Sequence, residues 1–117
     1  MSRKRSNILL LNDIQDSIFA IEEYVDGFSE DMFYNDRKTK DAVVRNFEII
    51  GEASRRTTEE LQNQFASINW REIGDLRNKM IHEYFGVDYV VVWEIIQIDL
   101  PDLKQKIKTA LDTISSK

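Results

Sequence analysis

The residues best suited to chemistry lie in one short stretch, from Arg77 to Tyr84. It contains His82, the only histidine in the 117 residues. Histidine exchanges protons near neutral pH, and the arginine guanidinium is a permanently charged fork that matches phosphate oxygens. Arg77 and His82 together therefore suit phosphodiester chemistry that needs no metal ion.

The spacing within this stretch has a geometric consequence if the stretch is a regular helix. Residues advance by about 100° each, so Asn78 and His82 share one face, while Arg77 and Tyr84 share another. Arg77 and His82 diverge by about 140° on a straight helix. One helix therefore does not bring them together unless its last turn loosens.

A second subunit would solve this problem and one other. If the phosphodiester is that of RNA, its cleavage by the 2′-hydroxyl needs a base for the nucleophile and often an acid for the leaving oxygen. One histidine cannot serve both at once. A two-fold axis near this helix would bring two copies of Arg77 and His82 into one cleft.

A purely structural interpretation of the same residues stays open. A histidine in the last turn of a helix is favoured there by the helix dipole, and Arg77 can pair with Asp75 or with a glutamate of another helix. Tyr84, at a position expected to face inward, is more often a core aromatic than a catalytic group. The residues alone favour this structural interpretation.

Length and composition favour one globular domain. Residues 1–117 are enough for one hydrophobic core and too few for two, so a single domain is expected. Hydrophobic residues make up 42% and charged residues 32%, unlike a disordered chain. With no cysteine and one histidine, we expect no disulfide, no metal site within a monomer and no cofactor.

Charge and hydropathy limit the partners. The apolar run from Ile8 to Leu11 is too short for a signal peptide or a membrane span, so no membrane partner is expected and a cytoplasmic location is natural. A formal net charge of −5 argues against tight, nonspecific nucleic-acid binding, because phosphate contacts need clustered Lys and Arg. Any contact with RNA must therefore be local or brief.

The apolar periodicity predicts an all-α bundle of four to five helices, because one proline and four glycines leave long uninterrupted segments. Ser6 or Asn7 is expected to cap the first helix, and Asp26-Gly27 to end it. A turn capped by Ser29 should follow, with Met32 and Phe33 packing inward, and then a helix from about Asn35 or Asp36 to Leu61. The next helix should be capped by Asn69, and its inward residues should be Ile73, Leu76, Met80 and Tyr84. The last helix should be capped by Asp88 and interrupted at Pro101.

Two details of these helices carry further expectations. Gly51, in the middle of the second long helix, predicts close packing against another helix. Residues 89–98 are apolar nearly all round, so this helix should be buried nearly all round, and homodimerisation through helical faces follows as a hypothesis. Glu48 and Glu52 resemble a carboxylate pair for a metal, but the arginines nearby favour an ion-paired surface.

The pattern Arg77-Asn78-x-x-x-His82-x-Tyr84 resembles the signature of the HEPN superfamily, in particular HepT-like toxins paired with minimal nucleotidyltransferase antitoxins. Further segments are similar to the same family and occur in the same order along the chain. They are Ala42 to Ala53, Trp70-Arg71-x-Ile73, Val87-Asp88, Trp93 and Leu100-Pro101. Several motifs in order across one small domain seldom match by chance.

The resemblance implies an up-and-down HEPN-type bundle that acts as a homodimer. It implies a metal-independent endoribonuclease, the toxin of a type VII toxin–antitoxin system, with Arg77 and His82 as catalytic residues and Asn78 as their support. It also implies that a nucleotidyltransferase antitoxin silences the toxin by AMPylation of Tyr84. The alternative is an HEPN-like binding module that partners a nucleotidyltransferase and has little turnover, which the acidic charge mildly favours.

Overall fold

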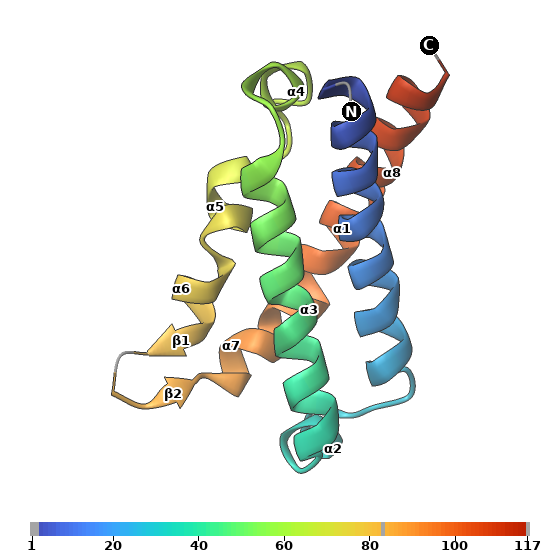
Figure 1. The fold of residues 1–117 in the computed structure, drawn as a ribbon. Helices are drawn as coiled ribbons and strands as arrows, with labels where there is room; N and C mark the ends of the chain where they lie inside the picture. The colour runs from blue at the N-terminus through green and yellow to red at the C-terminus, as the bar shows by residue number, and fades with distance from the viewer. Residues whose placement is uncertain (1–2, 83, 117) are drawn as a thin grey trace.

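The computed structural model describes residues 3–82 and 84–116, and it is an all-α bundle whose long members run alternately down and up (Figure 1). This confirms the predicted fold class. The long elements are α1 (Arg3–Val25), α3 (Arg37–Arg56), the pair α5 (Trp70–Gly74) and α6 (Leu76–Met80), and the continuous run of α7 (Tyr89–Glu94), η1 (Ile95–Asp99) and α8 (Leu100–Ser115). Short helices α2 (Glu30–Tyr34) and α4 (Glu59–Gln64) lie at the connections, and a hairpin of β1 (Ile81–His82) and β2 (Gly86–Val87) joins α6 to α7.

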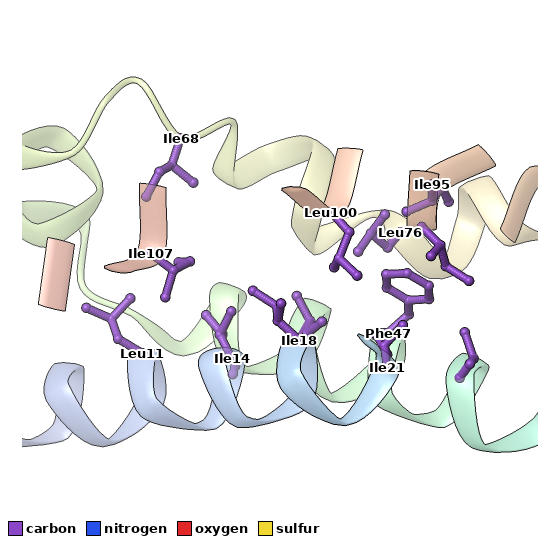
Figure 2. Close-up of a cluster of buried hydrophobic side chains, with 14 of the residues drawn as sticks. Leu11, Ile14, Ile18, Ile21, Phe47, Ile68, Leu76, Ile95, Leu100 and Ile107 are labelled. Atoms are coloured by element: carbon purple, nitrogen blue, oxygen red, sulfur yellow. The ribbon is translucent and has the colours of Figure 1, made fainter. Parts of the chain in front are cut away.

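The core lies where α1 and α3 face α5, α6 and α8. Leu11, Ile14, Ile18 and Ile21 of α1 are all fully buried. Figure 2 shows these side chains pointing toward Phe47 of α3 and Ile107 of α8. The three- and four-residue spacing of apolar residues thus forms one continuous hydrophobic cluster.

The predicted start of the first helix is wrong. α1 already includes Arg3, and Asn7 lies within it. The Asn7 amide instead donates to Thr58 Oγ1 at 2.9 Å, and its carbonyl oxygen accepts from the Thr58 N–H at 3.1 Å. Asn7 therefore connects α1 to the start of α4 by two hydrogen bonds. An asparagine amide can make both because it carries a donor and an acceptor.

The second long helix begins where predicted and ends earlier. Asp36 caps α3 by accepting from the Thr39 N–H at 3.0 Å. α3 ends at Arg56 rather than near Leu61, because Thr57 and Thr58 take extended backbone conformations and Thr58 caps a separate helix, α4. Two consecutive threonines favour such a cap over a helix interior, since their hydroxyls compete for backbone groups.

The turn before α3 also matches in part. Ser29 caps α2 as predicted, accepting from the Met32 N–H at 3.2 Å. Phe33 is fully buried, but the inward position predicted for Met32 is wrong, because that side chain is 49% exposed. One short turn can direct only one of two neighbouring side chains to the core.

The close packing predicted at Gly51 is confirmed. A Cβ added to Gly51 would lie 3.1 Å from the carbonyl oxygen of Ile73, and one added to Gly74 would lie 3.1 Å from Cγ of Arg55. α3 and α5 therefore meet through two glycines. This contact fixes the position of α5, and of α6 directly after it.

The third helix departs most from expectation. Asn69 caps α5 as predicted, accepting from the Glu72 N–H at 3.1 Å, but the helix is interrupted at Asp75 and α6 ends at Met80. Residues 81–82 then pair antiparallel with residues 86–87. Gly86 has a φ of 74°, a left-handed backbone conformation that glycine adopts without strain.

The fourth helical segment is capped by Asp88 as predicted. The change of helix geometry near Pro101 takes the form of a five-residue π-helix, η1, directly before α8, whose first turn contains Pro101. Proline lacks an N–H and clashes with the carbonyl four residues earlier, and a wider turn relieves both effects. Within residues 3–82 and 84–116, no helix combines the length and hydropathy that a membrane crossing needs.

Candidate active site

Arg77 projects from α6 toward α3. Its side chain is 68% exposed, and its Nε lies 3.8 Å from Oε2 of Glu48. The predicted pairing with a glutamate of another helix is therefore present, and Glu48 is ion-paired as expected. The same two residues border a hollow formed by the meeting of α3 and α5, which Arg45, Glu52 and Arg55 also line.

His82 lies on the hairpin, at the end of β1. Its side chain is 53% exposed, and its Nε2 lies 3.5 Å from Oδ2 of Asp88. The backbone is held on both sides, because His82 pairs with Gly86 in the ladder and its carbonyl oxygen accepts from the Phe85 N–H at 3.2 Å. An exposed imidazole on a fixed backbone can meet a substrate and exchange a proton with it.

Asn78 borders a different part of the surface. It is exposed on α6 and lines a shallow hollow with Asn69, Arg71 and Lys79. The helical face that Asn78 and His82 were expected to share does not exist, because α6 ends at Met80 and His82 continues as a strand.

Tyr84 lies in the hairpin turn. Its side chain is 84% exposed, so the inward position predicted for it is wrong. The helical face that Tyr84 was expected to share with Arg77 is absent for the same reason as that of Asn78 and His82. Phe85, next to it, is 87% exposed, and sequence reasoning did not single it out.

In the described part of a single chain, the motif residues border separate hollows. Arg77 lines the one against α3, Asn78 the one against α5, and His82 the one formed by the hairpin and the start of α7. One chain thus presents Arg77 and His82 as exposed side chains that line two different hollows.

Two acidic neighbours complete this description. Asp88 faces His82 and Glu48 faces Arg77, each from a different element. Sequence reasoning gave Asp88 only the role of a helix cap. Among residues 3–82 and 84–116 there is no group of three or more His, Cys, Asp or Glu side chains that could hold a metal ion.

The fold and the motif define the class of protein. A helical bundle that carries an exposed Arg and His in an Arg-Asn-x-x-x-His-x-Tyr pattern is of the HEPN type. The sequence model of the family described as "Ribonuclease HepT-like" matches residues 14–110, and the chain belongs to this family.

Curated relatives agree with this assignment. The chain is 43% identical over 103 residues to "Probable ribonuclease HepT" of Thermococcus cleftensis, covering 88% of this chain and 94% of that protein. It is 36% identical over 105 residues to "Putative RNase MJ1380" of Methanocaldococcus jannaschii, covering 90% of this chain and 96% of that protein.

A third relative is longer. "Gamma-glutamylcyclotransferase and putative RNase MJ0434" of Methanocaldococcus jannaschii is 38% identical over 106 residues, which are 91% of this chain and 48% of that protein. The chain thus spans about half of that relative. No solved structure gives a significant match.

Proposed function

We propose that this chain is an endoribonuclease toxin, acting in the cytoplasm as the toxic partner of a type VII toxin–antitoxin pair. One observation carries the proposal: the family match spans residues 14–110 and so includes Arg77 and His82, both of which are exposed on the surface. A catalytic side chain must be accessible to a polymeric substrate, whereas a histidine with only a structural role does not have to be exposed.

His82 acts as a general acid or base, and Arg77 stabilises the charge that develops on the phosphate in the transition state. Asn78 orients His82 or the scissile phosphate. No metal ion takes part. The separate hollows around Arg77 and His82 support a composite site, in which a homodimer brings the Arg77 of one copy toward the His82 of the other.

A minimal nucleotidyltransferase is the second partner in this proposal. It transfers AMP from ATP to the hydroxyl of Tyr84 and so silences the toxin. The 84% exposure of this side chain supports the assignment, because a modifying enzyme must reach the hydroxyl. A reading frame for a small nucleotidyltransferase beside this one would strengthen the proposal, and its absence would weaken it.

Cleavage of single-stranded RNA by the purified protein provides the test. We expect His82→Ala and Arg77→Ala to lower the rate by about 10²- to 10⁴-fold, the usual contribution of a general acid or base. Both side chains are exposed, so both variants should unfold at the wild-type temperature. Cleavage should also persist in EDTA. Undiminished cleavage by His82→Ala, or a strict need for a divalent ion, would contradict the proposal.

A binding module without turnover is the second candidate. The net charge of −5 favours it, because an acidic surface does not attract RNA. The same assay separates the two candidates: a module would bind its nucleotidyltransferase partner, and wild type and His82→Ala would leave RNA equally intact.

A further inference from the structure

Asp88 divides its two carboxylate oxygens between two tasks. Oδ1 accepts from the N–H groups of Val90 at 3.1 Å and Val91 at 3.2 Å, which caps α7. Oδ2 faces Nε2 of His82 at 3.5 Å. The cap contacts fix the orientation of the carboxylate, so the direction in which Oδ2 points is also fixed.

The backbone of Asp88 adds a second constraint. Its N–H donates to the carbonyl oxygen of Met80 at 2.7 Å, directly beyond the paired residues Ile81 and Val87. The start of α7 is thereby attached to the end of α6. Asp88 is only 28% exposed at its side chain, whereas His82 is 53% exposed, so the carboxylate lies on the protein side of the ring.

The contact selects one form of the imidazole. A neutral ring carries its proton on one of two nitrogens, and the partner of each nitrogen decides which. A carboxylate accepts and never donates, so it favours a proton on Nε2. Nδ1 is then left with a free lone pair.

We propose that Asp88 is a positioning residue that holds His82 in the Nε2–H form, so that Nδ1 is the nitrogen that exchanges a proton with the substrate. The catalytic consequence rests on the proposed ribonuclease function. Nδ1 takes the proton of the RNA 2′-hydroxyl while that oxygen forms a bond to phosphorus and the bond from phosphorus to the 5′-oxygen breaks. The 5′-oxygen takes its proton from the protonated His82 of a second copy, leaving a cyclic phosphate and a 5′-hydroxyl.

Asp88→Asn isolates this role from the cap. Asparagine caps helices about as well as aspartate, and its carbonyl oxygen must stay on the side of the Val90 and Val91 N–H groups. The amide NH₂ then occupies the place of Oδ2 and donates to Nε2. The ring must carry its proton on Nδ1, where it can no longer accept one from RNA.

Nitrogen-15 NMR of the imidazole reads the tautomer directly, and the single histidine of the chain makes the assignment unambiguous. At a pH where the ring is neutral, we expect the Nε2–H form in the wild type and the Nδ1–H form in Asp88→Asn. RNA cleavage by Asp88→Asn should fall by about 10²-fold or more, as when a general base is lost. Asp88→Glu, which keeps a carboxylate, should recover part of the rate.

The chain offers a matched control. Asp36 caps α3 in the same way, accepting from the Thr39 N–H at 3.0 Å. Asp36→Asn makes the same chemical change at the cap of a different helix, where the carboxylate is not paired with His82, and it should alter neither the tautomer nor the rate. An equal loss of rate in both variants would overturn the inference in favour of a purely structural role.

The outcomes separate this inference from the proposed function. The inference is overturned by an Nδ1–H ring in the wild type, or by an unchanged tautomer in Asp88→Asn. A tautomer that switches as expected in a wild-type protein that cleaves no RNA would sink the ribonuclease proposal and leave the role of Asp88 in place. If Asp88→Asn does not fold, the tautomer in the wild-type spectrum still tests the inference.

Discussion

Arg77 and His82 each face a carboxylate from another element. The Arg77 side chain is 68% exposed and its nearest contact to Glu48 is 3.8 Å, so solvent screens the pair. Exposed pairs of this kind contribute about 0 to 1 kcal/mol. An RNA phosphate, which can bind both arms of a guanidinium, can therefore displace Glu48 at little cost.

Tyr84 was expected to face inward but is 84% exposed, and this exposure supports its proposed role as a modification site. It shares no helix with Arg77, so its connection to the site is its position two residues after His82 in the hairpin turn. The proposed AMP group on Tyr84 would add bulk and negative charge two residues from His82 and would repel an incoming phosphate, as phosphorylation does elsewhere.

We expect Tyr84→Phe to keep most of its ribonuclease activity and to escape silencing by the nucleotidyltransferase and ATP. Intact-mass spectrometry and peptide mapping after incubation measure the modification. Tyr24→Phe is the matched control, because Tyr24 is 43% exposed on α1 and should leave the modification unchanged. Addition of AMP to Tyr84→Phe at the wild-type level would show that another residue is the target.

The sequence singles out candidate residues by their type but does not specify which partners surround them. Residue type identifies Arg77 and His82, since few side chains suit phosphate chemistry. Glu48 precedes Arg77 by 29 positions, and the fold alone brings them within 3.8 Å. No periodicity within one helix encodes such a contact, so Glu48 could be expected only as an ion-paired surface residue.

Among the elements, the hairpin β1–β2 determines where the candidate residue His82 lies. It replaces the last turn of the expected third helix and carries His82 and Tyr84 away from α6 (Figure 1). The approximately 140° divergence expected on one helix is therefore not the geometry of this site. The separation of Arg77 and His82 arises instead from a helix that ends and a strand that follows.

Local chemistry explains which elements could be predicted. Ser29, Asp36, Asn69 and Asp88 all cap helices as expected, because an N-cap depends on a side chain and the two or three N–H groups after it. The break at Asp75 and the end at Met80 depend instead on contacts made elsewhere: α5 is held against α3 through Gly51, and Asp88 bonds to Met80. Such tertiary contacts override helical periodicity in short segments.

Gly51→Ala should destabilise the protein by about 1 to 2 kcal/mol, the overpacking cost less the gain in helix propensity. The added methyl group would meet the carbonyl oxygen of Ile73 at 3.1 Å, and that atom belongs to the backbone of α5. Urea denaturation measures the effect. Glu52→Ala, an exposed change on the same helix, should stay within about 0.5 kcal/mol of the wild type. A Gly51→Ala protein more stable than the wild type would mean that α5 shifts freely.

At the scale of the whole molecule, the apolar run of residues 89–98 is divided between the core and the surface. Val92, Ile95 and Ile96 are buried within the chain itself, so only part of the run remains for a partner. Ile98 is 71% exposed and Val90 52% exposed, and the exposed aromatics Tyr84 and Phe85 lie in the neighbouring hairpin. If the proposed homodimer uses this run, it can bury only the outward side chains and not the whole helix.

This division determines which substitution tests the dimer. A charge at Ile95 would unfold the chain, because that side chain is only 2% exposed in the monomer. Ile98→Glu adds a charge that a monomer leaves in water, whereas an interface would bury it unpaired at a cost of several kcal/mol. We expect Ile98→Glu to shift the protein to the monomer and to abolish RNA cleavage. The unfolding midpoint of this monomer should show that the chain is still folded, because Ile98 lies outside the buried core.

Light scattering and an RNA cleavage assay on the same sample decide the matter. Leu9→Glu is the matched control: Leu9 is 44% exposed on α1, away from the hairpin, so the variant should dimerise and cleave as the wild type does. The composite site predicts that assembly and activity are lost together, because each chain presents Arg77 and His82 in separate hollows. A monomeric Ile98→Glu that cleaves RNA at the wild-type rate would mean that one chain carries the complete site.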